Sequence, residues 1–468
     1  MKIILSSVLI VLYSYCAAQP NNIQFNLEAQ ASITGKDKVP FWMKSNQFGN
    51  VPLAGIAAGF VAGAKKDYNK ASVKFFDWGA SLQGRLNTGS EINLTLIEGY
   101  GKVRLGIFEL RAGRSRETFG FADTLLTSGN FAVSGNALGV PKLQISIPEF
   151  YNIPFAGNFF SIKGNYAHGW LGEVPIQFAY KRVDKAKTFL HQKSLYLRLG
   201  KPDSKTKVYL GINDNVIWGN NEKIFPKNEF TLSSLQEYKY VVLSKKFEYS
   251  QVGNHLGTLD IALEHKTDKN TVMLYRQSFF DKDGLKHLAN VADGLNGVSI
   301  TRNTSSETFN LKKIVFELLY TKNQAAKSVA SQNLLGYEDY YNNYIYTQGW
   351  SYKSVGLGNP FITTRNDAEK NIPGNEREYF INNRVLAFHA GSQGTVYKWD
   401  YITKVSYSLN YGTFVTEKSF GKKTQFSCYL ETKRKIGNKL YLGFTGALDT
   451  GRLLGTSAGF LTKLEKRF

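Results

Sequence analysis

Apolar and polar residues alternate along most of this chain, and the alternation predicts β-strands. In the run 259–264, Leu259, Ile261 and Leu263 are separated by polar or small residues, and similar runs occur at 195–199, 314–321, 425–431 and 440–449. Successive side chains on a strand point to opposite faces. In water, such a sheet buries its apolar face, whereas in a membrane barrel that face contacts lipid and the polar face lines the lumen. In a barrel, Arg198, Asp260, Glu264 and Glu317 would therefore point inward.

The spacing of these runs predicts their connections. Near the C-terminus, runs at 384–390, 395–410, 411–419, 423–434, 439–449 and 456–468 are joined by short polar links, which indicates antiparallel hairpins. Longer irregular stretches at 114–142, 219–236, 281–296 and 324–383 are expected to be extracellular loops. At about 25 residues per strand and connection, the chain accommodates roughly 18 strands.

Both ends of the sequence favour a membrane barrel over a soluble sheet. Lys2, the apolar residues 3–15 and the small residues before Gln19 predict a signal peptide, 1–18, cleaved after Ala18. Residues 3–15 are too short for a transmembrane helix, which needs ~20 apolar residues. The last alternating run ends on Phe468, and a terminal aromatic residue is typical of barrels that the barrel-assembly machinery inserts.

We therefore expect an all-β fold, a single transmembrane antiparallel β-barrel over residues 19–468 in the cell outer membrane. Residues 19–50 are considered as an N-terminal periplasmic or plug segment. The expected partners include the assembly machinery, outer-membrane lipid and lipopolysaccharide.

The composition suits a membrane barrel, and the net charge indicates a negatively charged partner. The sequence contains 27 Tyr, 32 Phe and 43 Gly but only 11 Pro, which suits aromatic girdles on glycine-rich strands. Its formal net charge is +21, and an excess of this sign concentrates anionic partners. We therefore expect an anionic partner at the surface, and no nucleic-acid partner.

No catalytic or metal-binding pattern stands out. Residues 455–459 spell G-x-S-x-G, but no histidine follows them, so we expect a barrel turn rather than a nucleophile elbow. The six histidines include no pair at metal-ligand spacing. We expect no enzyme activity, no metal and no cofactor.

The sequence resembles the Wzi-type capsule-assembly family of outer-membrane proteins. Residues 324–335 differ from the family's usual pattern, so no loop contact is carried over there. The matching stretches are Pro40-Phe41-Trp42 within 39–49, then 111–114, 128–130, 134–137, 147–148, 168–170, 190–193, 254–257, 338–343, 349–352 and 358–360.

The resemblance implies an eighteen-stranded outer-membrane barrel that assembles or attaches capsule or exopolysaccharide, with lectin-like binding and no catalysis. Together with the positive net charge, it implies a surface polysaccharide that is acidic. Two alternatives remain: a porin or transporter for small solutes, and a weaker one, a membrane-embedded hydrolase.

Four candidate polysaccharide-binding residues lie in two early segments. Arg114 and Arg116 fall on one face of an alternating segment, and guanidinium groups bind carboxylates or phosphates in a fork. The alternative is lumenal pairing with acids such as Asp260 or Glu317. His168 and Trp170 could contact a sugar, or they could lie at a strand end in the membrane interface.

The remaining candidates lie in an aromatic-rich loop. Glu338 and Asp339 could accept hydrogen bonds from sugar hydroxyls, and Tyr341 and Trp350 could stack on sugar rings. Adjacent acids on a strand would point to opposite faces, which argues against a glycosidase pair. The alternative is that this loop packs its aromatic side chains to close the barrel mouth.

Overall fold

The computed structural model describes residues 23–35, 38–69, 75–226, 231–248, 250–282, 284–303, 308–325 and 338–468. The expected signal peptide, residues 19–22 and most of the altered stretch 324–335 lie outside the described residues.

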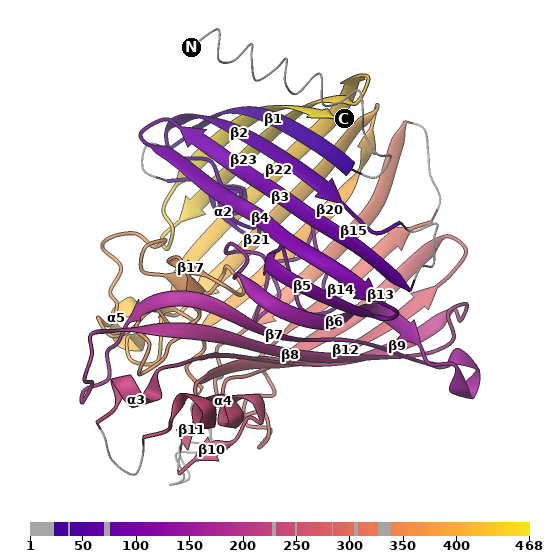
Figure 1. Ribbon diagram of the computed structural model, residues 1–468. Coiled ribbons are helices and arrows are strands. Elements are labelled where there is room, and N and C mark those ends of the chain that lie inside the picture. The colour runs from indigo at the N-terminus through magenta and orange to yellow at the C-terminus, as the bar shows by residue number, and fades with distance from the viewer. Residues whose placement is uncertain are drawn as a thin grey trace, which may run out of the picture.

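Eighteen strands form one closed antiparallel barrel, which confirms the predicted fold class (Figure 1). Each strand pairs with its neighbours in chain order, and β1 closes the ring by pairing with β24 from Asn26↔Arg467 to Thr34↔Gly459. The strands are β1 Ile23–Thr34, β2 Ile56–Lys66, β3 Phe76–Thr88, β4 Ile92–Leu105, β5 Phe108–Arg114, β6 Lys142–Asn152, β7 Phe160–Pro175, β8 Lys185–Leu199, β9 Thr206–Trp218, β12 Asn254–Lys266, β13 Asn270–Phe280, β14 Gly294–Arg302, β15 Phe309–Tyr320, β20 Val385–Val396, β21 Trp399–Asn410, β22 Lys423–Gly437, β23 Leu440–Gly451 and β24 Ser457–Arg467.

The two faces of the wall follow the alternation in the sequence. Ile261 on β12 is 51% exposed on the outer face, whereas its neighbour Asp260 is 3% exposed and faces the lumen. Glu317 is buried on the lumenal face of β15, and Phe316 is exposed outside. An exposed face made of large apolar side chains suits lipid rather than water.

The two ends of the barrel differ in their connections. The end where β1 begins and β24 ends, here the terminal end, has short turns such as 106–107, 397–398 and 438–439, and η1 Phe155–Asn158. The opposite, loop end carries the long connections 35–55, 115–141, 219–253, 281–293 and 321–384. Short turns are periplasmic and long loops extracellular in barrels of the outer membrane.

Short elements occur mainly within the long connections. None of the helices in the described part of the chain is long and apolar enough to cross a membrane. The elements are α2 Phe41–Lys44, α3 Asn221–Ile224, α4 Ser234–Val242, β10 Lys246–Phe247, β11 Ser250–Gln251, β16 Ser351–Tyr352, β17 Val355–Gly356, β18 Thr363–Thr364, β19 Phe380–Asn382 and α5 Glu417–Phe420.

Three segments, 38–50, 115–141 and 338–384, fold into the lumen at the loop end, and we call them the plug. Trp42 on α2 is fully buried, donates its indole N–H to Ser406 of β21 at 3.0 Å and packs on His389 of β20. Phe131 stacks on Phe279 of β13 with ring centroids 3.8 Å apart. The plug is therefore anchored on several wall strands. Within the range 19–50, residues 23–34 are a wall strand and residues 38–50 lie in the plug.

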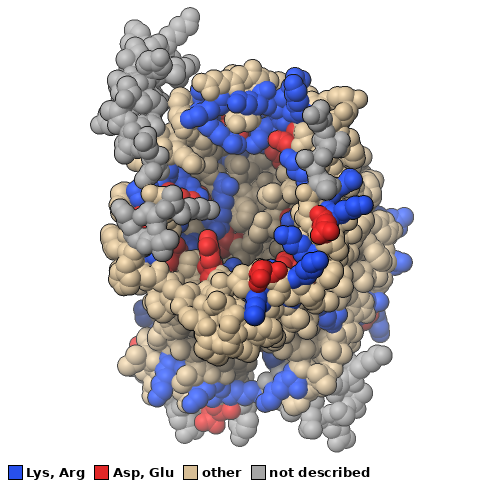
Figure 2. Space-filling model, turned by 90° about the vertical axis from the view of Figure 1, so that its right-hand side faces the viewer, with Lys and Arg blue, Asp and Glu red and all other residues tan. Residues whose placement is uncertain are grey.

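The lumen is hollow on the side where the terminal-end turns and η1 lie. Figure 2 shows this side as a hollowed face with Lys and Arg side chains gathered around it. The plug thus occupies the loop-end half, and a basic vestibule remains at the other.

Candidate functional site

The predicted acidic pair Glu338 and Asp339 lies inside the plug. The Glu338 carboxylate accepts backbone N–H bonds from Asp281 at 2.5 Å, Lys282 at 3.0 Å and Gly284 at 2.7 Å. Burial raises the pKa of Glu338 despite these bonds. Asp339 accepts a 2.6 Å bond from the Asn383 amide. Both carboxylates therefore hold loop backbone and side chains together.

Tyr341 and Trp350 join the three plug segments. The Tyr341 hydroxyl donates to the Phe131 carbonyl and accepts from the Asn359 backbone N–H at 2.6 Å. Trp350 is fully buried and donates its indole N–H to the Ala132 carbonyl at 2.8 Å.

These contacts change the sequence-based hypothesis. The structure buries Glu338, Tyr341 and Trp350 and gives their polar atoms partners within the protein. A polysaccharide outside the barrel would have to displace the plug to reach them. We therefore no longer propose direct sugar contact for these residues or for Asp339, and assign them to closing the barrel mouth.

Arg114 and Arg116 lie in different surroundings. Arg114 is buried and donates to the Leu96 carbonyl and the Tyr352 hydroxyl, both at 2.8 Å, so it joins wall to plug. Arg116 is exposed in the lumen and donates to the Gln83 side chain. The two guanidinium groups thus do not form one binding face.

The acids named as lumenal partners have other roles. Asp260 accepts bonds from Asn213 and Gln277, and Glu317 accepts from Thr127 and Ser128 of the plug. Neither acid pairs with Arg114 or Arg116, because both carboxylates are already engaged elsewhere in the lumen.

His168 and Trp170 lie on the outer face of β7. Trp170 is exposed, and the His168 ring lies 5.3 Å from Trp170 and 5.6 Å from Trp218. Tyr238 of α4 packs on the same cluster, 5.8 Å from His168. The position agrees with a strand end in the membrane interface, where tryptophan is common.

The 219–253 connection folds back over this outer wall. Ser233 and Gln236 form a capping box at the start of α4. Lys193 of β8 donates to the Val242 carbonyl at 2.7 Å and the Ser244 hydroxyl at 2.6 Å. Polar residues on the outer wall therefore find partners in the folded-back connection instead of facing lipid.

A cavity of about 510 Å³ opens among these loops, and we call it the loop pocket. Tyr180 and Tyr344 are 76% and 57% exposed. Among the described lining residues, Glu237 and Glu248 are the acids and none is a Lys or Arg. The lining residues are Phe178, Tyr180, Asn221, Phe225, Pro226, Leu232, Glu237, Phe247, Glu248, Ser250, Gln251, Val252, Gly253, Tyr344, Ile345 and Tyr346.

Backbone contacts between remote segments fix the loop pocket. Gln177 donates its backbone N–H to the Ile345 carbonyl at 2.9 Å, and the Phe178 and Phe225 rings meet edge to face at 4.8 Å. The Glu237 carboxylate accepts from the backbone N–H groups of Gly219 and Asn221, both at 3.0 Å. Burial raises the pKa of Glu237 to about 7. Glu237 thus positions the pocket wall.

The loop pocket offers exposed aromatic faces beside polar groups. Such faces can stack on the C–H faces of sugar rings, and amides, hydroxyls and carboxylates can bond sugar hydroxyls. The sequence pointed to the aromatic stretch around Tyr344 and Tyr346 but missed the other rings. Those rings, from Phe178, Tyr180, Phe225 and Phe247, lie in two other connections, 176–184 and 219–253, and nothing local in the sequence links them.

Two further features do not form reactive sites. Ser457 of the G-x-S-x-G stretch donates to Asp449 at 3.1 Å, and Asp449 also accepts the Phe41 backbone N–H at 2.7 Å, so this serine ties β24 to the start of α2. Over the described ranges, no three His, Cys, Asp or Glu side chains gather as a metal site would require.

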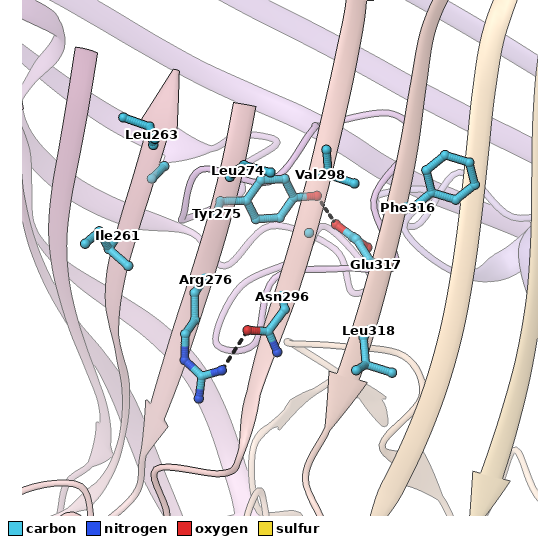
Figure 3. A pocket seen from close by; sticks show the side chains of 12 residues that line it. Ile261, Leu263, Leu274, Tyr275, Arg276, Asn296, Val298, Phe316, Glu317 and Leu318 are labelled. Atoms are coloured by element: carbon cyan, nitrogen blue, oxygen red, sulfur yellow. Dashed lines mark hydrogen bonds between the residues drawn. The ribbon is translucent and has the colours of Figure 1, made fainter. Parts of the chain in front are cut away.

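A groove of about 580 Å³ crosses the wall between β12 and β15 (Figure 3). Gly297 is one of its lining residues, and a side chain there would collide with the Tyr275 ring, whose hydroxyl donates to Glu317 on the lumenal side. Ile261, Leu274 and the other exposed apolar side chains of the groove face the lipid side. We therefore interpret the groove as an uneven part of the lipid-facing surface and not as a binding site.

Comparison with known proteins gives a family and a fold. Residues 27–370 match the family described as capsule assembly protein Wzi. Wzi of Escherichia coli, whose structure is described as a carbohydrate-binding β-barrel involved in group 1 capsule assembly, shares 11% identity at a TM-score of 0.58. The match covers 94% of this chain and 83% of that chain.

Two Pseudomonas aeruginosa structures are less similar. OccK9 (OpdG) gives 9% identity and a TM-score of 0.45 over 96% of this chain and 98% of that chain. OpdQ gives 8% identity and a TM-score of 0.46 over 96% of this chain and 99% of that chain. A search of curated proteins finds no match.

Proposed function

This chain belongs to the Wzi capsule assembly family, and on that premise we propose that it retains polysaccharide at the cell surface by binding it in the loop pocket. The protein is an outer-membrane β-barrel of capsule assembly. The finer statement, lectin-like and non-catalytic attachment, rests on one observation: exposed aromatic rings surround a cavity at the loop end.

The size and chemistry of the loop pocket support a sugar ligand. Its volume of about 510 Å³ lies within the range of roughly 300–1,000 Å³ that small-molecule sites occupy. Because the charged residues of its described lining are the acids Glu237 and Glu248, this lining suits neutral sugar faces better than carboxylates. The acidic character of the polymer therefore remains a prediction, which the basic vestibule supports better than the loop pocket.

The plug argues against the porin alternative. Trp42, Phe131 and Trp350 are fully buried where an open pore would be wide. Solutes would have to move a packed core that is hydrogen-bonded to the wall.

The test is retention of polysaccharide by a deletion strain that expresses variants. Tyr180→Ala with Tyr344→Ala removes two exposed rings, and we expect release of polysaccharide into the medium with synthesis unchanged. For purified protein, we expect an affinity loss of about tenfold per ring, which is 1.4 kcal/mol.

The matched control is Tyr397→Ala, an equally exposed tyrosine in a terminal-end turn. It should retain polysaccharide like the wild type. Full retention by the double variant, at normal levels of folded barrel, would refute the loop pocket as the binding site.

A further inference from the structure

A second cavity, of about 270 Å³, lies in the lumen, and we call it the lumenal pocket. Its walls come from β5 to β8, and residues 116–120 at the underside of the plug cover it. The lining residues are Arg111, Arg116, Glu117, Thr118, Phe119, Gly120, Gln144, Ser146, Ile147, Pro148, Lys163, Gly164, Asn165, Ser194 and Tyr196.

The lining carries three cations and one carboxylate, a net charge of +2. Glu117 is engaged by Lys142, Arg111 and Ser115. Arg116 bonds Gln83 through its side chain and Glu98 through its backbone N–H, at 3.2 Å for the latter. Over the described ranges, the side chains of Arg116 and Lys163 have no carboxylate oxygen within 4.0 Å. Neither charge is therefore neutralised by an ion pair over these ranges, although Glu149 attracts Lys163 from a greater distance.

The same pocket holds buried polar groups without partners in the described part of the protein. Gln144 and Ser146 are 5% and 6% exposed, yet Gln144 Oε1 and Ser146 Oγ accept or donate no hydrogen bond there. Asn165 Nδ2 is likewise unpaired, although its Oδ1 accepts from Ser194. Buried polar groups in native proteins are nearly always paired with protein, water or ligand, so these atoms are available to bond a polar group that enters the pocket.

Two aromatic rings complete the lining. Phe119 and Tyr196 are lining residues, and the Lys163 ammonium lies 5.7 Å from the Tyr196 ring centroid. Cations, amides, a hydroxyl and ring faces in one small space match a sugar that carries a carboxylate. The volume lies just under the range for drug-sized ligands, which suits a single sugar unit.

We propose that the lumenal pocket binds one uronate unit of an anionic saccharide. Arg116 and Lys163 pair with the carboxylate, Gln144, Ser146 and Asn165 bond the ring hydroxyls, and Phe119 or Tyr196 covers the sugar face. This site is separate from the loop pocket and does not depend on the proposed function of that pocket.

The basic vestibule provides the approach to the pocket. Lys163 and Tyr196 lie in the terminal-end parts of β7 and β8, and Arg111 lies midway along β5, so the pocket adjoins the hollowed, basic side in Figure 2. Figure 2 shows mainly Lys and Arg around the hollow, with some Asp and Glu among them, and an excess of positive charge raises the local concentration of anions. An anionic saccharide would therefore reach the site from the periplasm.

The test is calorimetric titration of the full chain in detergent with glucuronate, glucose and inorganic phosphate. We expect glucuronate to bind at least tenfold more tightly than glucose or phosphate, and added salt to weaken that binding. Lys163→Gln and Arg116→Gln should each weaken glucuronate binding about tenfold. Lys398→Gln, which removes an exposed charge from a terminal-end turn, should leave binding unchanged.

Several outcomes would overturn the inference. They are no glucuronate binding by the wild type, equal binding of glucose, equal binding of phosphate, or wild-type affinity in both Lys163→Gln and Arg116→Gln. The Tyr180→Ala, Tyr344→Ala double variant separates the two proposals, because it should bind glucuronate normally whatever it does to surface polysaccharide.

Discussion

At the scale of single residues, buried carboxylates hold the loop end together. Glu338 accepts three backbone N–H groups, and Glu237 accepts two. Glu378 is buried in the plug and accepts the Thr413 hydroxyl at 2.8 Å. These acids lose water on folding, so the protein binds their protons more tightly than the unfolded chain does.

Glu378 predicts a pH dependence of stability. Burial, and then the nearby Asp339, raise the pKa of Glu378 from about 4.5 to about 7. Between these values the folded state binds more protons, so the free energy of unfolding falls as pH rises from about 4.5 to about 7. We expect a lower melting temperature at pH 8 than at pH 5.5, and a smaller difference in Glu378→Gln, which keeps an acceptor for Thr413.

Thermal unfolding of the detergent-solubilised barrel at the two pH values measures this effect. The raised pKa of Glu237 also makes the melting temperature fall as pH rises, so part of the pH dependence of the melting temperature should remain in Glu378→Gln. Glu376→Gln, at an exposed position two residues away, is the control and should follow the wild type. If Glu378→Gln showed the same change in melting temperature between the two pH values as the wild type, Glu378 would not be the source of the pH dependence.

At the scale of elements, each wall strand has a lipid face and a lumenal face. Leu430 lies at the middle of β22, opposite Thr403 of β21 and Gly446 of β23, and its side chain is exposed on the outside. Its neighbours Tyr429 and Glu431 face the lumen, where their side chains hydrogen-bond each other at 2.7 Å. One strand thus meets two solvents of opposite polarity.

Leu430→Arg is therefore expected to cost ~2–4 kcal/mol in the free energy of unfolding, the cost of an arginine at the bilayer midplane. Leu430→Phe should cost little, because it keeps an apolar side chain in lipid. Gln393→Arg, on the lumenal face of β20, should also cost less than Leu430→Arg. Reversible unfolding from lipid vesicles in denaturant measures all three. Equal costs for the two arginine variants would show that the inside–outside register is mistaken.

At the scale of the whole molecule, the barrel is closed at one end and open at the other. The plug joins wall strands from β13 to β21, whereas the opposite half of the lumen is a basic vestibule. The sequence has a formal net charge of +21, and some of its Lys and Arg side chains gather around the hollow of the lumen.

Planar-bilayer recording should show no steady large conductance for the wild-type protein, because the packed plug blocks the path. Trp350→Ala removes the ring that donates a hydrogen bond to Ala132, and it should increase the frequency of brief channel openings in the recording. Trp78→Ala, at an exposed position on the outer wall, should not. A steady large conductance in the wild type would restore the porin alternative.

The sequence by itself determined the barrel. Alternation is a local property, because each side chain's face on a strand depends only on its position relative to its neighbours. Leu259, Asp260 and Ile261 therefore identified a two-faced wall, and short polar links identified antiparallel hairpins before any contact was known. The matching stretches from Pro40 to Pro360 added the family.

Only the tertiary structure decided where ligands can bind. Tyr341 and Trp350 are residue types that commonly bind sugars. They are buried here by contacts with Phe131 and Ala132, which lie more than two hundred positions earlier in the chain. The loop pocket and the lumenal pocket both combine side chains from several connections or strands. Exposure and enclosure depend on which remote segments pack together, and no local pattern in a sequence carries that information.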